Sequence, residues 1–154
     1  MLVKDLVTLT FVTAHSRHAD LWKRWVAISL KIGGLLPDSF LSVAVQRVAD
    51  IDLVLRCMEE EYRIPVPNRG IDTGFHYQGM LSELWVGDVY EVFRLLEERK
   101  LSPNQEAFKA LTHHLRLLRI PLEKHEIALD KKLSEPLTML KMPVLNEKGD
   151  IYEY

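Results

Sequence analysis

Apolar residues recur every three or four positions along most of this chain, which is the spacing of one face of an α-helix. The pattern predicts helices over about residues 16–32, 38–62, 75–100 and 102–120. Pro121 is expected to end the fourth helix, to kink it, or to open a fifth helix that runs to about residue 133. The chain is therefore predicted to be mainly helical.

Glycine, proline and small polar residues mark where these helices start and stop. Gly33 and Gly34 are expected to stop the first helix. Ser102 is followed by Pro103 and, three residues after the serine, by a glutamine, which is the pattern of an N-cap with a capping box. A stretch rich in proline and glycine predicts a long loop over residues 63–74.

The two ends of the chain have a different pattern. Val7, Leu9 and Phe11 alternate with threonines as in a half-buried strand, so the opening segment is predicted to be either strand or helix. Residues 142–145 and 151–154 are expected to be short extended pieces on either side of a turn. These pieces could pair with the opening segment.

Together these patterns predict an all-α fold, a single-domain bundle of four or five helices over residues 1–154. Residues 1–15 and 135–154 are expected to form less regular ends with short extended segments. Hydrophobic residues make up 47% of the chain and charged residues 27%, which excludes a disordered segment. The 7 glycines and 7 prolines are too few for a fold of many short strands and tight turns.

The sequence predicts a cytoplasmic protein. Cys57 is the lone cysteine, so no internal disulfide can form, and we expect it to be a small buried side chain. The opening segment has too little positive charge before its apolar residues for a signal peptide. Because no apolar stretch is long enough to cross a bilayer, we expect no membrane association.

Two charged residues interrupt the predicted apolar stripes. Arg47 lies seven residues from both Phe40 and Val54, and Asp88 lies seven residues after Leu81. A charge in the middle of a buried face must find a partner or become neutral. We therefore expect Arg47 and Asp88 to meet across the helix interface as a buried ion pair that fixes the helix register. The alternatives are that one or both line a polar pocket, or that the predicted phase of the helix is misplaced.

The histidines give little indication of metal chemistry. His15 and His18 are three residues apart and could share a helix face as ligands, but no HExxH or CxxC motif accompanies them. We expect both to be solvated or capping residues, and we expect no metal and no cofactor. His114 flanks the stripe formed by Leu111 and Leu118, so a half-buried role is predicted for it.

Cationic side chains accumulate in the last predicted helices. Arg116, Arg119, Lys124 and His125 lie beside the predicted break at Pro121, which would suit a bound phosphate. His114, Arg116 and Lys124 are the candidate binding residues. An arginine that holds a phosphoryl oxygen and a histidine that moves a proton suffice for metal-free attack of a ribose 2′-hydroxyl on its own phosphodiester. Arg119 and His125 are the candidates for these two roles.

An all-helical domain in which an arginine and a histidine flank five residues near the last helices resembles the HEPN superfamily. Members of that superfamily often act as metal-independent ribonucleases in toxin–antitoxin and phage-defence systems. Arg119 and His125 carry the motif over, and the resemblance covers about residues 16–133. It implies a composite site shared by two protomers. The family favours a polar residue after the arginine, whereas Ile120 stands there in this chain.

Two functions are therefore predicted. The first is a helical module that acts through protein–protein contacts, expected as a homodimer, with the loop over residues 63–74 and Trp22 near its working surface. Trp22 and Trp25 are expected to pack in the bundle or in a dimer interface. The alternative is a HEPN-like ribonuclease. Because the net charge is −2, any RNA contact must be local and salt-sensitive, for example over residues 109–132, which carry six Lys or Arg against three Asp or Glu.

Overall fold

The computed structural model describes residues 2–35, 40–64, 74–101, 104–124, 144–145 and 151–152. Most of these residues are helical, which confirms the predicted all-α fold. The helices are α1 (Val3–Arg17), α2 (Ala19–Leu35), α3 (Leu41–Tyr62), α4 (Gly74–Glu98) and α5 (Gln105–Lys124).

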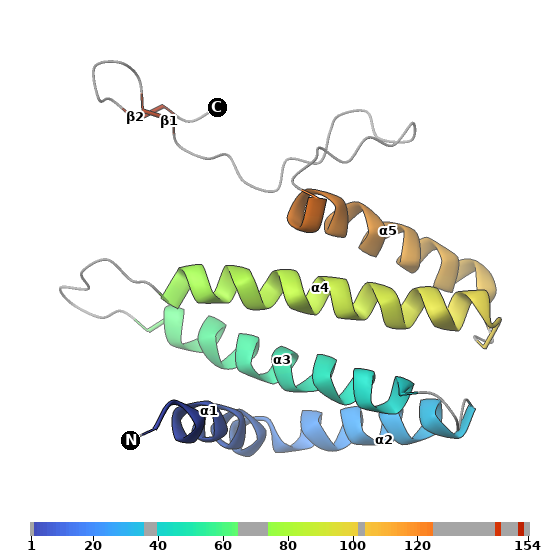
Figure 1. Ribbon diagram of the computed structural model, residues 1–154, viewed down its shortest axis with the longest axis horizontal. Helices are drawn as coiled ribbons and strands as arrows, with labels where there is room; N and C mark the ends of the chain where they lie inside the picture. The colour runs from blue at the N-terminus through green and yellow to red at the C-terminus, as the bar shows by residue number, and fades with distance from the viewer. Residues whose placement is uncertain are drawn as a thin grey trace.

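The helices are stacked in the order of the chain (Figure 1). Figure 1 shows α1 and α2 one after the other along one side, followed by α3, α4 and α5. Helix α3 packs against α1, α2 and α4, and α5 packs against α4. Because the backbones of α2 and α5 make no contact, the described helices form an open layer rather than a closed bundle.

The opening segment is the helix α1, so the expectation of an irregular first 15 residues is wrong. The backbone N–H of Leu2 donates a hydrogen bond of 3.1 Å to the carboxylate of Asp5, which stabilises the first turn. The hydroxyl of Thr10 donates to the carbonyl of Leu6 at 2.9 Å, so this threonine is satisfied within the helix. The threonines are therefore compatible with a helix, although their alternation with apolar residues did not distinguish a helix from a strand.

The expected pairing between the two chain ends is also wrong. Strands β1 (Val144–Leu145) and β2 (Ile151–Tyr152) are extended as predicted, but they pair with each other in antiparallel register. An antiparallel pair close in sequence needs only a short turn, whereas pairing with the opening segment would require that segment to leave its helix.

A break at His18 separates the first two helices. His18 is the C-cap residue of α1, with φ −118° and ψ 40°, and α2 starts at the next residue. The helix predicted over residues 16–32 is therefore shifted along the chain, because α2 spans Ala19–Leu35. Gly33 and Gly34, which were expected to stop it, lie inside the helix. Gly33 is tolerated for a packing reason: a Cβ at this position would lie 3.1 Å from the Cβ of Ser42 on α3.

Helix α4 ends in a Schellman motif. The N–H of Leu101 donates to the carbonyl of Leu96, and the N–H of Lys100 donates to the carbonyl of Glu97, each at 3.0 Å. Leu101 also packs against the cluster that contains Leu96. Lys100 takes the left-handed position that glycine usually occupies, with φ 54°. The predicted end of this helix near residue 100 is thus confirmed.

The N-cap of helix α5 lies two residues after the predicted cap, Ser102. The side-chain oxygen of Asn104 accepts a hydrogen bond of 3.1 Å from the N–H of Ala107, so Asn104 is the N-cap. Ser102 and Pro103 lie outside the described residues. At its other end α5 runs through Pro121 to Lys124, so the proline does not end the helix.

Three clusters of buried apolar side chains hold the layer together. The first joins α1 to α3 and contains Ala14, Leu53, Val54 and Cys57. The second joins α3 to α4 and contains Leu41, Val45, Val92 and Leu96. The third joins α3, α4 and α5 through Val48, Val89 and Leu115.

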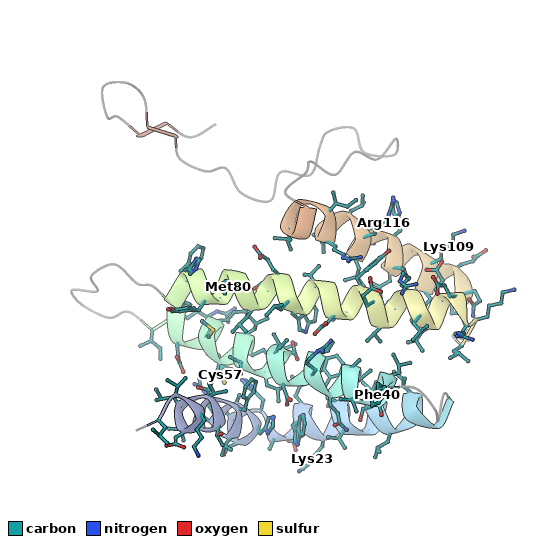
Figure 2. The ribbon with its side chains drawn as sticks, in the orientation of Figure 1. Lys23, Phe40, Cys57, Met80, Lys109 and Arg116 are labelled. Carbon is teal, nitrogen blue, oxygen red and sulfur yellow. The ribbon has the colours of Figure 1, made fainter. Side chains whose placement is uncertain are left out.

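The predicted burial of Cys57 and the predicted packing of two tryptophans are confirmed. Cys57 is buried between α1 and α3, where Figure 2 labels it. Trp22 packs against the cluster of Cys57, and Trp25 packs against the other two clusters. None of the described helices is both long and apolar enough to cross a membrane.

Candidate functional site

The open layer leaves an apolar trough between α2 and α5. Its volume is about 440 Å³, and α3 and α4 contribute its floor. The lining side chains are all apolar or aromatic: Trp25, Ile28, Ile32, Val45, Val48, Trp85, Val89, Val92, Phe93, Leu96, Phe108, Leu111 and Leu115. The trough is open to solvent, because Ile28 on the α2 wall is 42% exposed and Leu111 on the α5 wall is 44% exposed.

One wall of the trough is held by a carboxylate that sequence reasoning missed. Asp52 on α3 is buried, and its Oδ2 accepts a hydrogen bond of 3.0 Å from the indole N–H of Trp25. The same oxygen accepts a hydrogen bond of 3.1 Å from Nε of Arg56. A charged acceptor makes stronger hydrogen bonds than a neutral one, so Asp52 fixes the ring of Trp25 in the wall. Asp52 lies seven residues, or about two helical turns, after the buried Val45, so the sequence could have placed this carboxylate on a buried face of the helix.

The floor contains an unsatisfied polar atom. Trp85 lines the trough, and its buried Nε1 has no hydrogen-bond partner among the described residues. A buried donor without an acceptor is unfavourable by about 1–3 kcal/mol.

The rim of the trough is basic. Arg24 precedes Ile28 by four residues and Lys31 follows it by three, so both lie beside Ile28 on the surface of α2. Both side chains are exposed, and neither has a partner within the described part of the chain. On α5, His114 follows Leu111 by three residues and is exposed. The half-buried role predicted for His114 is therefore wrong, because it lies one step outside the buried stripe.

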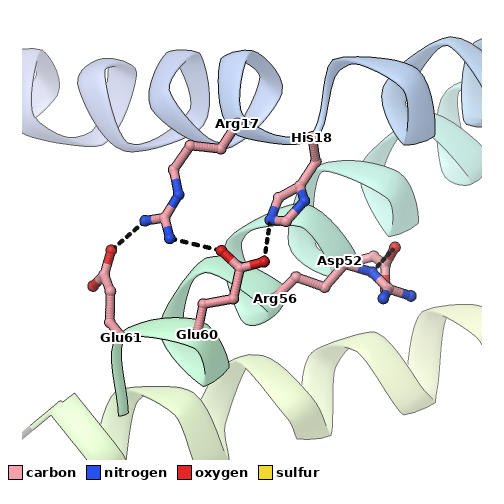
Figure 3. A network of polar contacts seen from close by, with 6 residues as sticks. All are labelled: Arg17, His18, Asp52, Arg56, Glu60 and Glu61. Atoms are coloured by element: carbon pink, nitrogen blue, oxygen red, sulfur yellow. Dashed lines mark hydrogen bonds and ion pairs between the residues drawn. The ribbon is translucent and has the colours of Figure 1, made fainter. Parts of the chain in front are cut away.

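A polar network fixes the junction of α1 and α2 onto the end of α3 (Figure 3). Arg17 donates to Glu61 at 2.6 Å and to Glu60 at 2.7 Å. The hydrogen bonds to Glu61 and then to Glu60 raise the pKa of Arg17 above its usual value. Nε2 of His18 lies 3.8 Å from Oε1 of Glu60. The acidic run at the end of α3 thus holds α1 in place.

His15 is not the solvated or capping residue that the sequence predicts, and His18, although it is the C-cap residue of α1, is not solvated. Nε2 of His15 lies 2.8 Å from Asp50 of α3, and its ring stacks on Trp22 with centroids 4.1 Å apart. The side chain of His18 is 16% exposed. Both are packed between helices, because they lie on the face of α1 that also carries the buried Ala14.

Arg47 and Asp88 meet as predicted, but they do so at the surface. Nε and Nη2 of Arg47 each lie 2.7 Å from one carboxylate oxygen of Asp88, a bidentate geometry that joins α3 to α4. The side chain of Arg47 is 64% exposed and that of Asp88 is 24% exposed. The expectation of a buried pair is therefore wrong.

The reason is the phase of helix α3. The predicted stripe ran through Phe40 and Val54; Phe40 is 86% exposed, whereas Val54, in the second half of the helix, is buried. The face that packs against the neighbouring helices instead runs through Leu41, Val45 and Val48, which are buried. Arg47 lies away from that face, and its long side chain reaches along the helix to the carboxylate.

The candidate phosphate site is only partly described. Arg119 is 29% exposed, and its Nη1 lies 3.0 Å from Glu91 of α4. Its guanidinium also lies over the ring of Tyr90, 4.8 Å from the centroid. Arg119 is thus already engaged by a carboxylate and an aromatic face. His125 lies outside the described residues, so the resemblance to HEPN ribonucleases stays a prediction.

The other predicted binding residues are described only in part. Arg116 is exposed on α5, where Figure 2 labels it. Lys124 is the last residue of α5, and its side chain lies outside the described part of the chain. Most of the loop over residues 63–74 also lies outside it. Among the described residues, no group of three or more His, Cys, Asp or Glu side chains could hold a metal ion.

Comparison of the sequence with models of known families gives no match, and neither does comparison with curated proteins or with solved structures.

Proposed function

We propose that this chain is a helical docking module that takes one helix of a partner protein into the trough between α2 and α5. The observation that carries the proposal is the trough itself, whose lining contains no polar residue and whose two walls are open to solvent at Ile28 and Leu111. A helix of a partner that inserts its apolar face would bury these side chains, as in other helix-in-groove complexes.

The rim specifies the chemistry of that helix. Arg24 and Lys31 stand beside the α2 wall, and His114 stands beside the α5 wall. Asp20, the acidic residue of α2 that lies one turn before Arg24, is already paired with Lys23 at 3.3 Å. We therefore expect the partner helix to carry glutamate or aspartate on the side of its apolar face that lies against α2, since rim charges of opposite sign favour encounter.

The test is a binding titration with a designed peptide. The probe is a fluorescently labelled amphipathic helix of about four turns, with leucines at positions i, i+3, i+4 and i+7 and glutamates beside them. Its matched control replaces the glutamates by lysines and keeps the leucines. We expect the glutamate peptide to bind at least about tenfold more tightly at low salt, and the difference to shrink as salt is added.

Matched variants of the chain locate the site. Leu111→Glu places a charge on the trough wall and should weaken binding by at least about tenfold. Leu30→Glu places the same charge on α2, where Leu30 is 66% exposed and does not line the trough, and it should bind as the wild type does. Equal binding by both variants, or no binding of the leucine peptides to the wild-type chain, would contradict the proposal.

A further inference from the structure

Helix α1 carries two apolar stripes on opposite sides. Phe11 and Ala14 belong to the side that packs on α3. The other stripe consists of Leu2, Leu6, Leu9 and Thr13, with Leu2 as the N-cap residue, and we call it the outer stripe. At about 100° per residue, Leu9 lies roughly 160° around the helix from Phe11, so this stripe faces away from α3.

The outer stripe has the spacing of a coiled-coil seam. Its members are separated by four, three and four residues, the alternation that places apolar residues along one edge of a helix that pairs with another helix. Leu2, Leu6 and Leu9 are 61%, 45% and 56% exposed. No described element covers them, since the helices in contact with α1 are α2 and α3.

The exposed area is large for a helix of this length. Val3 and Val12 flank the outer stripe and are 77% and 57% exposed. Together with the three leucines they expose roughly 550 Å² of mainly apolar surface, which is near the upper end of the largest patch that a monomer usually shows. A helix that is apolar all round is normally buried on all sides.

Charge decides which partner fits. From Leu6 to Ala14 α1 carries no charged residue. Arg17, near its end, is held by Glu60 and Glu61. Asp5 lies one turn from Leu2 and from Leu9 at the edge of the stripe, where its carboxylate accepts the hydrogen bond from the N–H of Leu2. A surface that meets its own copy about a two-fold axis must not bring like charges together, and the uncharged span from Leu6 to Ala14 satisfies this condition. It offers nothing to attract an acidic or basic partner or the headgroups of an anionic membrane.

We propose that the outer stripe of α1 is a self-association surface, which packs against the same stripe of a second copy of this chain. Two copies would bury at most roughly 1,100 Å² in total, which is the size of a small, weak interface. The outer stripe shares no residue with the trough, so this proposal does not depend on the docking function.

The test measures the oligomeric state of the full chain by sedimentation velocity. The wild type should be a dimer at concentrations of about 10–100 µM, and the dimer should persist when salt is raised, because no charge pair holds it. The double variant Leu6→Glu/Leu9→Glu should be monomeric, with the dissociation constant raised by at least about 100-fold. Leu30→Glu and Leu111→Glu, which place a glutamate on α2 and on α5, should remain dimeric.

Circular dichroism of each variant shows whether the fold is intact. If the glutamate variant does not fold, Leu6→Ser/Leu9→Ser provides the same comparison with a smaller perturbation. A wild-type chain that is monomeric at about 100 µM would overturn the proposal, as would a dimer that folded outer-stripe variants leave unchanged. Binding of a monomeric wild type to neutral phosphatidylcholine vesicles would assign the surface to lipid instead, and would also overturn it.

Discussion

The carboxylate of Asp52 is expected to contribute more to stability than any surface ion pair of this chain, and replacing it by alanine tests this. Its side chain is 11% exposed and accepts hydrogen bonds from Trp25 and Arg56. Removing it leaves the indole N–H of Trp25 inside the helix layer without its acceptor. The change therefore acts on the wall of the trough as well as on the fold.

The size of the effect follows from the two hydrogen bonds. A hydrogen bond to a charged group contributes about 1.5–3 kcal/mol when it is shielded from water, which applies to the bond from Trp25. Arg56 is 50% exposed and lies one helical turn away, so its pair with Asp52 contributes only about 0.3–0.5 kcal/mol. We therefore expect Asp52→Ala to lower the free energy of unfolding by about 2–3 kcal/mol. Asp52→Asn keeps an acceptor for the indole N–H of Trp25, so its free energy of unfolding should fall by less than that of Asp52→Ala.

Asp88 provides the matched control. It also accepts two hydrogen bonds from one arginine, but Arg47 is largely exposed, so water and salt screen the pair. Asp88→Ala should lower stability by about 0.5–1 kcal/mol. Urea unfolding followed by circular dichroism compares the variants under equal conditions. If Asp52→Ala is as stable as Asp88→Ala, the hydrogen bond from Trp25 to Asp52 does not contribute about 1.5–3 kcal/mol to stability.

Two further predictions concern single residues. Burial raises the pKa of the Cys57 thiol, which disfavours the reactive thiolate, so alkylation by iodoacetamide at about pH 8 should be much slower in the folded chain than in urea; equal rates would contradict the buried position. Lys100→Gly should raise the free energy of unfolding by about 0.5–1 kcal/mol, because a lysine is strained at φ 54° and glycine is not; a loss of stability in urea unfolding would show that the Schellman motif needs the lysine side chain.

The longest helix was predictable from the sequence, and the first helix was not. Val89, Val92 and Leu96 of α4 recur at helical spacing on one side and are buried. In α1 the inner and outer stripes lie on opposite sides, so the apolar residues give no single face to detect. The alternation of Val7 and Leu9 with threonines, typical of a strand, results from these two stripes.

The pairing of Arg47 with Asp88 was predictable because each charge stood out from an apolar pattern, but its exposure was not. Helix α3 lies between α2 and α4 and also contacts α1, so apolar residues occur around most of its circumference, and the sequence does not show which stripe faces which neighbour. The trough was missed for a related reason. Each of its walls is an ordinary apolar stripe, and only the arrangement in space shows that α2 and α5 do not meet.

A dimer formed through the outer stripe of α1 would carry two troughs. The outer stripe belongs to α1, whereas the trough belongs to α2, α3, α4 and α5, so pairing through α1 leaves both troughs of a dimer open. A partner that carries two acidic helices could then engage both troughs of one dimer, and its second binding event would be intramolecular. Such linkage raises the overall affinity by about 10²–10⁴ without a new contact, provided that the linker spans the two troughs. Glutamates in the outer stripe should remove this gain and leave the affinity of a single helix unchanged, which separates the contribution of the dimer from that of the trough.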